Sequence, residues 1–268
     1  MKKLRKLFLR LVCLLLCLYV VFVLFTYFFQ EKLLFHPTVL QQDHKFSFVS
    51  DFEEVFIPVD ENVNLHGLLF KAEESKGLIF YLHGNGGCVE GWGNAAGTFT
   101  ATGYDLFMPD YRGYGKSGGT IESEEQIIND MQKAYSFMLK QYSPQNVVIA
   151  GYSIGTGPAT VLAATNPNKM LILQAPYYSL TSLIDEKVPI LPDFVKKYEF
   201  RTNTYIEKVA APVVIFHGTE DELIPYGHAE RLAGHCPQEC TLIPLPGEGH
   251  NSIKESELFR QELKRILQ

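Results

Sequence analysis

Residues 147–157, which read VVIAGYSIGTG, decide the predicted fold and supply the first candidate functional residue. An apolar strand at 146–150 runs into the G-x-S-x-G pattern around Ser153, and a helix rich in small residues follows at 155–165. This order predicts a sharp strand-to-helix turn that leaves the serine strained and exposed. Glycines on both sides of Ser153 let strand and helix pack closely, and the helix N-terminus favours developing negative charge. Ser153 is therefore the candidate nucleophile; the alternative is a serine that caps an ordinary helix.

A nucleophilic serine needs a base, and the base needs an orienting acid. Of the eight histidines, His250 is best placed, in a loop after the last expected strand, and we predict that it is the base. Taken alone, it would be an ordinary surface histidine. The acidic run Glu220-Asp221-Glu222 follows the strand at 213–217, and the residues themselves do not choose among the three. The chain order serine, acid, histidine differs from that of other serine proteases.

The oxyanion of an acyl-transfer reaction must also be bound. The apolar run 78–83 ends in Gly84-Asn85-Gly86-Gly87, a loop whose glycines let the main chain approach a substrate. We predict that the backbone amides of Asn85 and Ile154 are the two donors. His83 is expected to fix the loop and to take no part in catalysis.

The body of the chain alternates strands with helices. We predict strands at residues 52–59, 64–71, 78–83, 105–109, 146–150, 170–174, 213–217 and 241–245, and helices at 122–142, 155–165, 225–233 and 252–267. This alternation predicts an α/β fold with a mostly parallel sheet covered by helices on both faces, and sites at the carboxyl ends of its strands. Residues 177–208 interrupt the pattern as a short insertion, either a lid over the site or a plain surface excursion.

Length and composition exclude several classes of protein. The 268 residues suit one or two domains, and 46% hydrophobic residues can bury a full core, so a disordered or fibrous chain is excluded. Five cations lie within the first ten residues, and the other 258 carry 19 basic and 30 acidic side chains, a balance of −11. A body this acidic repels polyanions, so nucleic acid is not an expected partner.

Residues 11–29 form an uncharged apolar run of about 28 Å as a helix, close to the roughly 30 Å of a bilayer's hydrocarbon core. A cleaved signal peptide is the alternative, but no A-x-A-like site follows the run, so we predict an uncleaved transmembrane anchor. The positive-inside rule keeps the basic segment 1–10 cytoplasmic and places the rest on the extracytoplasmic side. The expected organisation is segment 1–10, anchor 11–29, linker 30–49 and catalytic domain 50–268.

Five cysteines give limited information on the compartment. Cys13 and Cys17 lie in the apolar run and are expected to pack there, while Cys88 stands alone. Cys236 and Cys240 either bridge, as an oxidising compartment would permit, or remain two unpaired thiols near a loop.

Two rival motifs are discounted. Residues 113–118 read GYGKSG, a literal G-x-G-x-x-G, but the loop is outside the first βα unit and lacks the acidic residue of a dinucleotide site. The same loop imitates the end of a Walker A motif, yet its required first glycine is Asp110. No H-E-x-x-H pattern occurs and the histidines are dispersed, so neither metal nor cofactor is expected. His228 and His235 are expected to face solvent.

The segments LHGNGG, PDYRGYGKSGG, GYSIGTG, HGTEDELIP and GEGHN, in this order, resemble the α/β-hydrolase superfamily over essentially the whole chain. With the N-terminal anchor and QEKLLFHP, the sequence is similar to the membrane-anchored Bem46-like branch, related to serine aminopeptidase S33-type hydrolases. The resemblance implies Ser153 as nucleophile, His250 as base, Asp221 as acid, and Asn85 and Ile154 as oxyanion residues. It also implies that residues 112–119 are structural, with Asp110 and Arg112 bracing them.

The predicted function is a membrane-anchored serine hydrolase that cleaves an acyl ester or thioester through an acyl-enzyme, without a cofactor. Its expected partners are the membrane and an acylated small molecule, a lipid or an acylated protein; the apolar insertion residues Phe194, Tyr198 and Phe200 favour such substrates. An S33-type serine peptidase is the alternative within the same class, although no site for a substrate's terminal amine is evident. The alternative from another class is an inactive, membrane-tethered binding module.

Overall fold

A computed structural model of the chain describes residues 1–236 and 239–268. Its centre is an eight-stranded sheet with the strand order β10-β9-β8-β7-β4-β6-β3-β2. The strands from β10 to β6 are mutually parallel, and β3 is antiparallel to both β6 and β2. The predicted α/β class and mostly parallel sheet are therefore confirmed.

The strands of this sheet lie within about two residues of their predicted ranges. Their bounds are β2 Phe52–Asp60, β3 Val63–Phe70, β4 Leu78–Leu82, β6 Asp105–Pro109, β7 Val147–Tyr152, β8 Met170–Gln174, β9 Val213–Gly218 and β10 Cys240–Leu245. Strands β4, β6, β7 and β9 are buried at every residue, as expected for central parallel strands covered on both faces.

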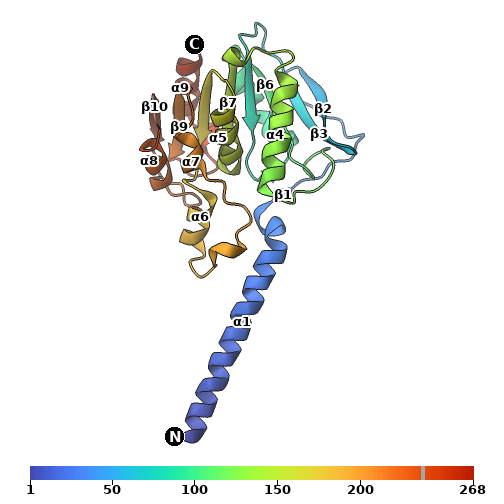
Figure 1. The fold of residues 1–268 in the computed structure, drawn as a ribbon. Coiled ribbons are helices and arrows are strands. Elements are labelled where there is room, and N and C mark those ends of the chain that lie inside the picture. The colour runs from blue at the N-terminus through green and yellow to red at the C-terminus, as the bar shows by residue number, and fades with distance from the viewer. Residues whose placement is uncertain (237–238) are drawn as a thin grey trace.

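Helices cover both faces of the sheet (Figure 1). Their bounds are α1 Lys2–Leu34, α2 Val89–Trp92, α3 Ala96–Thr100, α4 Glu124–Met138, α5 Thr156–Thr165, α6 Leu180–Lys187, α7 Thr202–Ile206, α8 Gly227–Ala233 and α9 Glu257–Leu267, with 3₁₀ turns η1 Gly93–Ala95, η2 Pro144–Asn146, η3 Ser153–Gly155, η4 Asp193–Val195 and η5 Ile253–Glu255. Two apolar cores result: α4, α5 and α8 pack on one face, and α2, α3 and α9 on the other.

Helix α4 has an N-terminal cap and the buried apolar face that its sequence predicts. Ser123 caps it by accepting a hydrogen bond from the Gln126 amide at 3.1 Å. Its predicted apolar face is buried, and Asp130, buried on the same helix, binds Arg112 through two hydrogen bonds of 2.6 and 3.0 Å. This bidentate pair braces the loop after β6, as expected for Arg112.

Helix α1 projects from the domain as a long rod (Figure 1). It is long and apolar enough to cross a membrane and includes the predicted anchor at 11–29. The segment after it, predicted to be a linker, pairs with the domain: β1 (His36–Pro37) lies parallel to β5 (Gly86–Gly87), and Val39 bridges to Gly115. A two-residue strand has no periodic pattern, so the sequence gives no signal for this pairing.

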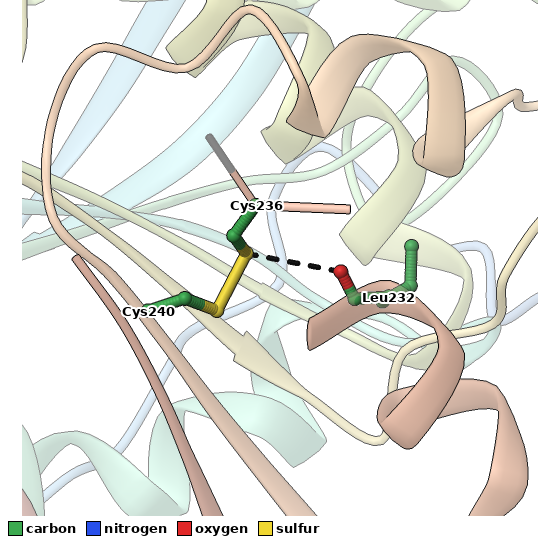
Figure 2. Close-up of a disulfide and its surroundings, with 3 residues drawn as sticks. All are labelled: Leu232, Cys236 and Cys240. Carbon is green, nitrogen blue, oxygen red and sulfur yellow. Dashed lines mark hydrogen bonds between the residues drawn. A yellow bond between two sulfur atoms is a disulfide. The ribbon is translucent and has the colours of Figure 1, made fainter. Parts of the chain in front are cut away.

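Cys236 and Cys240 are joined by a disulfide, which links the end of α8 to the start of β10 (Figure 2). The sequence alone did not decide between this disulfide and two unpaired thiols. Among the residues that the structure describes, Cys13 and Cys17 are free and exposed on α1, and Cys88 is free and buried.

Gly155 provides a test of the packing behind Ser153. A Cβ at this position would lie 2.7 Å from the His83 carbonyl oxygen and would also clash with the Leu82 carbonyl, both of them rigid backbone. We expect Gly155→Ala to lower the free energy of unfolding by about 2–3 kcal/mol, measured by urea denaturation of the detergent-solubilised chain. Gly227→Ala is the control, because a Cβ there meets nothing within 4 Å; it should change stability by no more than about 1 kcal/mol. Equal effects of the two substitutions would contradict the proposed close packing.

Candidate active site

Ser153 lies at the turn between β7 and α5, where the sequence placed it. Its φ of 52° is a left-handed conformation that costs a non-glycine residue energy, so the predicted strain is confirmed. Gly151 makes the turn possible, because a Cβ there would lie 2.6 Å from the Gly155 carbonyl oxygen. The predicted exposure is wrong: Ser153 is only 8% exposed. Phe35 and Phe200, from segments remote in sequence, line a small cavity beside the neighbouring Ile154.

His250 bridges the serine to an acid. Its Nε2 lies 2.9 Å from Ser153 Oγ, and its Nδ1 lies 2.7 Å from Asp221 Oδ2. The three residues follow β7, β9 and β10, whose carboxyl ends meet at one edge of the sheet. The Tyr152 hydroxyl also donates a hydrogen bond to the His250 carbonyl, so the residue before the serine helps to fix the histidine's loop.

Asp221 is the acid that reaches His250, which resolves the choice left by the acidic run. Its Oδ1 accepts hydrogen bonds from the backbone amides of Leu223 and Ile224, at 2.9 and 2.8 Å. Glu220 and Glu222 are exposed. The turn thus fixes one carboxylate oxygen and leaves the other for the imidazole.

The charge of Asp221 is stabilised despite its burial. Burial alone would raise the pKa of this carboxyl, but hydrogen bonds from His217, His250 and the Ile224 amide outweigh burial and hold the pKa well below its ordinary value. His217 Nε2 lies 3.4 Å from Asp221 Oδ2 and 2.8 Å from the Ile224 carbonyl oxygen. The carboxylate is therefore ionised at neutral pH and can stabilise a positive charge on His250.

The two candidate oxyanion donors lie on adjacent turns. Ile154 occupies the second position of η3, so its amide is one of the free N–H groups at the start of a helical segment. Asn85 lies between β4 and β5, and its side-chain Oδ1 accepts hydrogen bonds from the His36 amide at 3.2 Å and the Tyr114 hydroxyl at 3.1 Å. With its side chain held on that side, the Asn85 backbone amide has no hydrogen-bond acceptor among the described residues.

The loop that carries Asn85 is held by His83, as predicted, and also by Asp110, which was predicted to brace residues 112–119 instead. His83 is fully buried, its Nδ1 lies 2.7 Å from the Gly84 carbonyl oxygen, and its Nε2 lies 3.2 Å from Asp110 Oδ1. Burial disfavours the charge of Asp110, but His66 and His83 face it and lower its pKa. The same carboxylate accepts the Val89 amide at 2.9 Å.

Residues 73–207 match the family model described as serine aminopeptidase, S33. Alpha/beta hydrolase domain-containing protein 17C of Mus musculus is 32% identical over 229 residues, which are 81% of this chain and 68% of that protein. The chain belongs to the α/β-hydrolase superfamily.

A second relative, Alpha/beta hydrolase domain-containing protein 17B of Homo sapiens, is 35% identical over 169 residues, which are 61% of this chain and 55% of that protein. Two solved structures share the fold with TM-scores of 0.66. Ferulic acid-bound Est1E from Butyrivibrio proteoclasticus is 20% identical and covers 80% of this chain and 97% of its own. The Pyrococcus furiosus esterase Pf2001 is 19% identical and covers 87% of this chain and 98% of its own.

The residues of the motif that imitates a phosphate loop make contacts within the domain. Lys116 Nζ bonds Glu54 Oε2 at 2.6 Å, and its side chain is only 3% exposed. Gly115 has a φ of 51°, and a Cβ there would clash with the Asp110 carboxylate. These contacts support a structural role for the loop, as the resemblance implied.

Histidines outside the site pair with carboxylates. The expectation that His228 faces solvent is wrong: it is 2% exposed, its Nδ1 accepts the Tyr178 amide at 3.0 Å, and its Nε2 lies 3.0 Å from Glu186. His235 is only partly exposed and lies 2.7 Å from Glu207. In the described part of the hydrolase, no group of three or more His, Cys, Asp or Glu side chains is placed to hold a metal ion.

The insertion at 177–208 extends from the carboxyl end of β8, between the strands that carry Ser153 and Asp221. Its Tyr177 hydroxyl donates to the Ile154 carbonyl at 3.0 Å, which supports the oxyanion turn and was not foreseen from the sequence. Tyr198 and Phe200 are buried, whereas Phe194 is 81% exposed. Of the three aromatics, two therefore pack inside the insertion and one points outward.

The lowered pKa of Asp221 predicts a pH dependence of stability. A carboxyl with a depressed folded-state pKa contributes stability that is complete above its ordinary pKa of about 4 and is lost as the pH falls toward the folded-state value. At neutral pH, we expect Asp221→Asn to be less stable than the unaltered chain by about 1.5–3 kcal/mol. The difference in the free energy of unfolding between the two proteins, measured by urea denaturation, should become smaller below about pH 4. The exposed Glu222→Gln serves as control, and a gap for Asp221→Asn that is constant with pH would contradict the prediction.

Proposed function

We propose that this hydrolase is a membrane-anchored serine enzyme that cleaves an acyl ester or thioester. The observation that carries the proposal is the continuous chain of hydrogen bonds from Ser153 through His250 to Asp221. That chain contains a nucleophile, a base within reach of its proton, and a buried acid that fixes the base.

In the proposed mechanism, Ser153 Oγ attacks the acyl carbonyl while His250 Nε2 takes its proton. Asp221 keeps the imidazole tautomer and stabilises the imidazolium. The Asn85 and Ile154 amides bind the oxyanion, a contribution of about 3–4 kcal/mol per donor in a well-studied protease. His250 then protonates the leaving group, and water, activated by the same imidazole, releases the acid and regenerates the serine.

The substrate class is supported by the surroundings of Ser153. The apolar anchor α1 ends at Leu34, and Phe35, directly after it, helps to line a small cavity beside Ile154 together with Phe200 of the insertion. The cavity itself is too small for an acyl chain, but its apolar lining favours an acyl group over a polar peptide next to Ile154. We therefore favour a lipid or an acylated protein as substrate, with an acylated small molecule as the simplest form.

A serine peptidase is the second candidate, and the S33 description of the matching family favours it. An aminopeptidase needs an acidic group to bind the substrate's terminal amine. Glu124, which reaches the insertion, is already bound to the backbone amides of Glu199 and Phe200 at 2.6 and 2.9 Å. This engagement argues for the ester or thioester class.

The proposed location is a single-pass membrane protein with a cytoplasmic N-terminus and an extracytoplasmic catalytic domain. The five cations at positions 2–10 and the positive-inside rule support this orientation. The disulfide between Cys236 and Cys240 supports it independently, because such bonds persist in oxidising compartments.

A fluorophosphonate probe tests the catalytic proposal. The full chain should label at Ser153, and Ser153→Ala and His250→Ala should abolish labelling. Asp221→Asn should slow labelling by about 10³–10⁴-fold, because the imidazole loses its orienting charge. Glu220→Gln and Glu222→Gln are matched controls and should label normally. Folded protein that does not label would instead favour a tethered binding module.

The same reagent in a membrane-impermeant form reports the orientation. Labelling of intact cells places the domain outside, and labelling only after permeabilisation would overturn the proposed location.

A series of acyl esters tests the substrate class. We expect kcat/KM to rise by at least about tenfold from short to long acyl chains, since each buried methylene contributes about 0.8 kcal/mol. Aminoacyl amides of the same hydrophobicity are the comparison for peptidase activity. Faster hydrolysis of short soluble esters or of the amides would contradict the proposed class.

A further inference from the structure

The insertion ends in an apolar tip that lies beside the anchor helix. Residues 188–195, here called the lid tip, read VPILPDFV. Ile190 is 62% exposed and Phe194 is 81% exposed, whereas Leu191 and Val195 are buried. Two large apolar side chains therefore point outward from a short segment that α6 and η4 hold in place. Figure 1 shows this segment on the side of the domain from which α1 emerges.

Three hydrogen bonds fix the insertion along α1. The Tyr19 hydroxyl donates to the Ile190 carbonyl at 3.0 Å. Further along the helix, the buried Gln30 donates to the Val195 carbonyl at 3.0 Å and accepts from the Lys197 amide at 2.9 Å. Tyr19 and Gln30 are eleven residues apart, or about 16 Å along a helix. The lid tip thus follows α1 for three turns toward its N-terminus.

The level at which α1 leaves the bilayer is marked by its own residues. The apolar run ends at Phe29, and Glu31 and Lys32 follow. Lys197 of the insertion bonds Glu31 at 3.0 Å and lies 4.8 Å above the Tyr27 ring. Tyrosines and lysines gather at membrane–water interfaces, where an apolar body meets a polar headgroup. Tyr19, and with it the Ile190 carbonyl, lies on the bilayer side of this level.

We propose that the lid tip is a second membrane contact, which inserts Ile190 and Phe194 among the acyl chains of the leaflet next to α1. The inference rests on the membrane anchoring stated under the proposed function. Lipid is the occupant because the exposed face of the tip continues the lipid-facing surface of α1, to which it is bonded.

The charged residues near the tip are compatible with this position. Lys196 has a fully buried side chain and binds the carboxylates of both Asp185 and Asp193, the latter at 2.6 Å. Asp193 is exposed, and its ion pair with Lys196 compensates its charge next to Phe194. Paired charges at an interface keep part of their hydration, whereas unpaired charges in the acyl layer would not.

This contact also defines how an acyl substrate reaches Ser153. From the lid tip the insertion returns through Tyr198, whose ring lies 5.1 Å from that of Phe35, and then through Phe200. Phe35 and Phe200 line the small cavity beside Ile154. An acyl chain that leaves the leaflet at the lid tip would meet a row of buried aromatic side chains before the oxyanion turn, and Tyr198, Phe35 and Phe200 must separate to admit it. The substrate class that this route selects is an acyl group resident in the bilayer.

Tryptophan quenching by brominated lipids tests the contact directly. The chain has one tryptophan, Trp92, which donates to the Gly86 carbonyl beside the oxyanion loop and provides a constant background. The full-length Phe194→Trp and Ile190→Trp variants are reconstituted in phosphatidylcholine vesicles with and without brominated acyl chains. We expect brominated lipid to remove at least half of the added fluorescence.

Phe56→Trp is the matched control, since Phe56 is an exposed phenylalanine on β2, the edge strand of the sheet opposite β10. Its added fluorescence should be unaffected. Quenching of the lid-tip variants no stronger than that of Phe56→Trp would overturn the proposal. So would a blue-shifted but unquenched Phe194→Trp signal, because it would mean that a second protein copy covers the tip.

A functional experiment separates this proposal from the catalytic one. The double substitution Ile190→Asp with Phe194→Asp should lower turnover of a long-chain ester embedded in vesicles by at least tenfold, and should leave the rate of fluorophosphonate labelling unchanged. Phe56→Asp should change neither. Unchanged turnover in vesicles would overturn the substrate route. If quenching occurs while Ser153 fails to label, the membrane contact stands and the proposed hydrolysis falls.

Discussion

The close approach of Gly155 to the carbonyls of Leu82 and His83 is the constraint on which the site depends. It presses the turn that carries Ser153 against the loop that follows β4, so that the serine and both candidate oxyanion amides share one small region. No side chain fits between these backbones, and the absence of one at Gly151 lets the turn close on the other side. Ser153 can keep its strained φ of 52° because β7 on one side and η3 with α5 on the other hold the turn in place.

Two buried carboxylates, Asp221 and Asp110, also hold the site together. Asp221 loses water on folding, a cost that its two backbone amides and two histidine neighbours offset. The same principle recurs at Asp110 beneath the oxyanion loop, where His66 and His83 face a fully buried carboxylate. The hydrolase therefore uses buried carboxylates twice: one orients the candidate base, and the other holds the loop that carries Asn85.

Much of this fold and site was predictable from sequence, for identifiable reasons. Strands β4, β6 and β7 are short apolar runs followed by glycine-rich turns, and that pattern marks the carboxyl edge of a parallel sheet. Ser153 and His250 stand in turns with a recognisable composition. Asp221 could be separated from Glu220 and Glu222 only by coordinates or by resemblance, because the turn decides which carboxylate faces inward.

The features that the sequence did not reveal depend on contacts between remote segments. The pairing of His36–Pro37 with Gly86–Gly87 has no periodicity to detect, and the burial of His228 depends on Glu186, which lies on the insertion. The small cavity beside Ile154 is likewise lined by Phe35 and Phe200, which are far apart in the chain. Local patterns of polarity carry no information about such neighbours.

The short pairing of β1 with β5 has a kinetic consequence. If α1 lies in a bilayer, as proposed, the domain is joined to its tether at the loop that carries Asn85, and this short connection limits how far the domain can swing or rise. Its reach would then be confined to a thin layer above the lipid, and it would meet a membrane substrate by lateral diffusion in two dimensions. The rate of such an enzyme follows the surface density of its substrate, so adding inert lipid would slow it even when the total amount of substrate is unchanged.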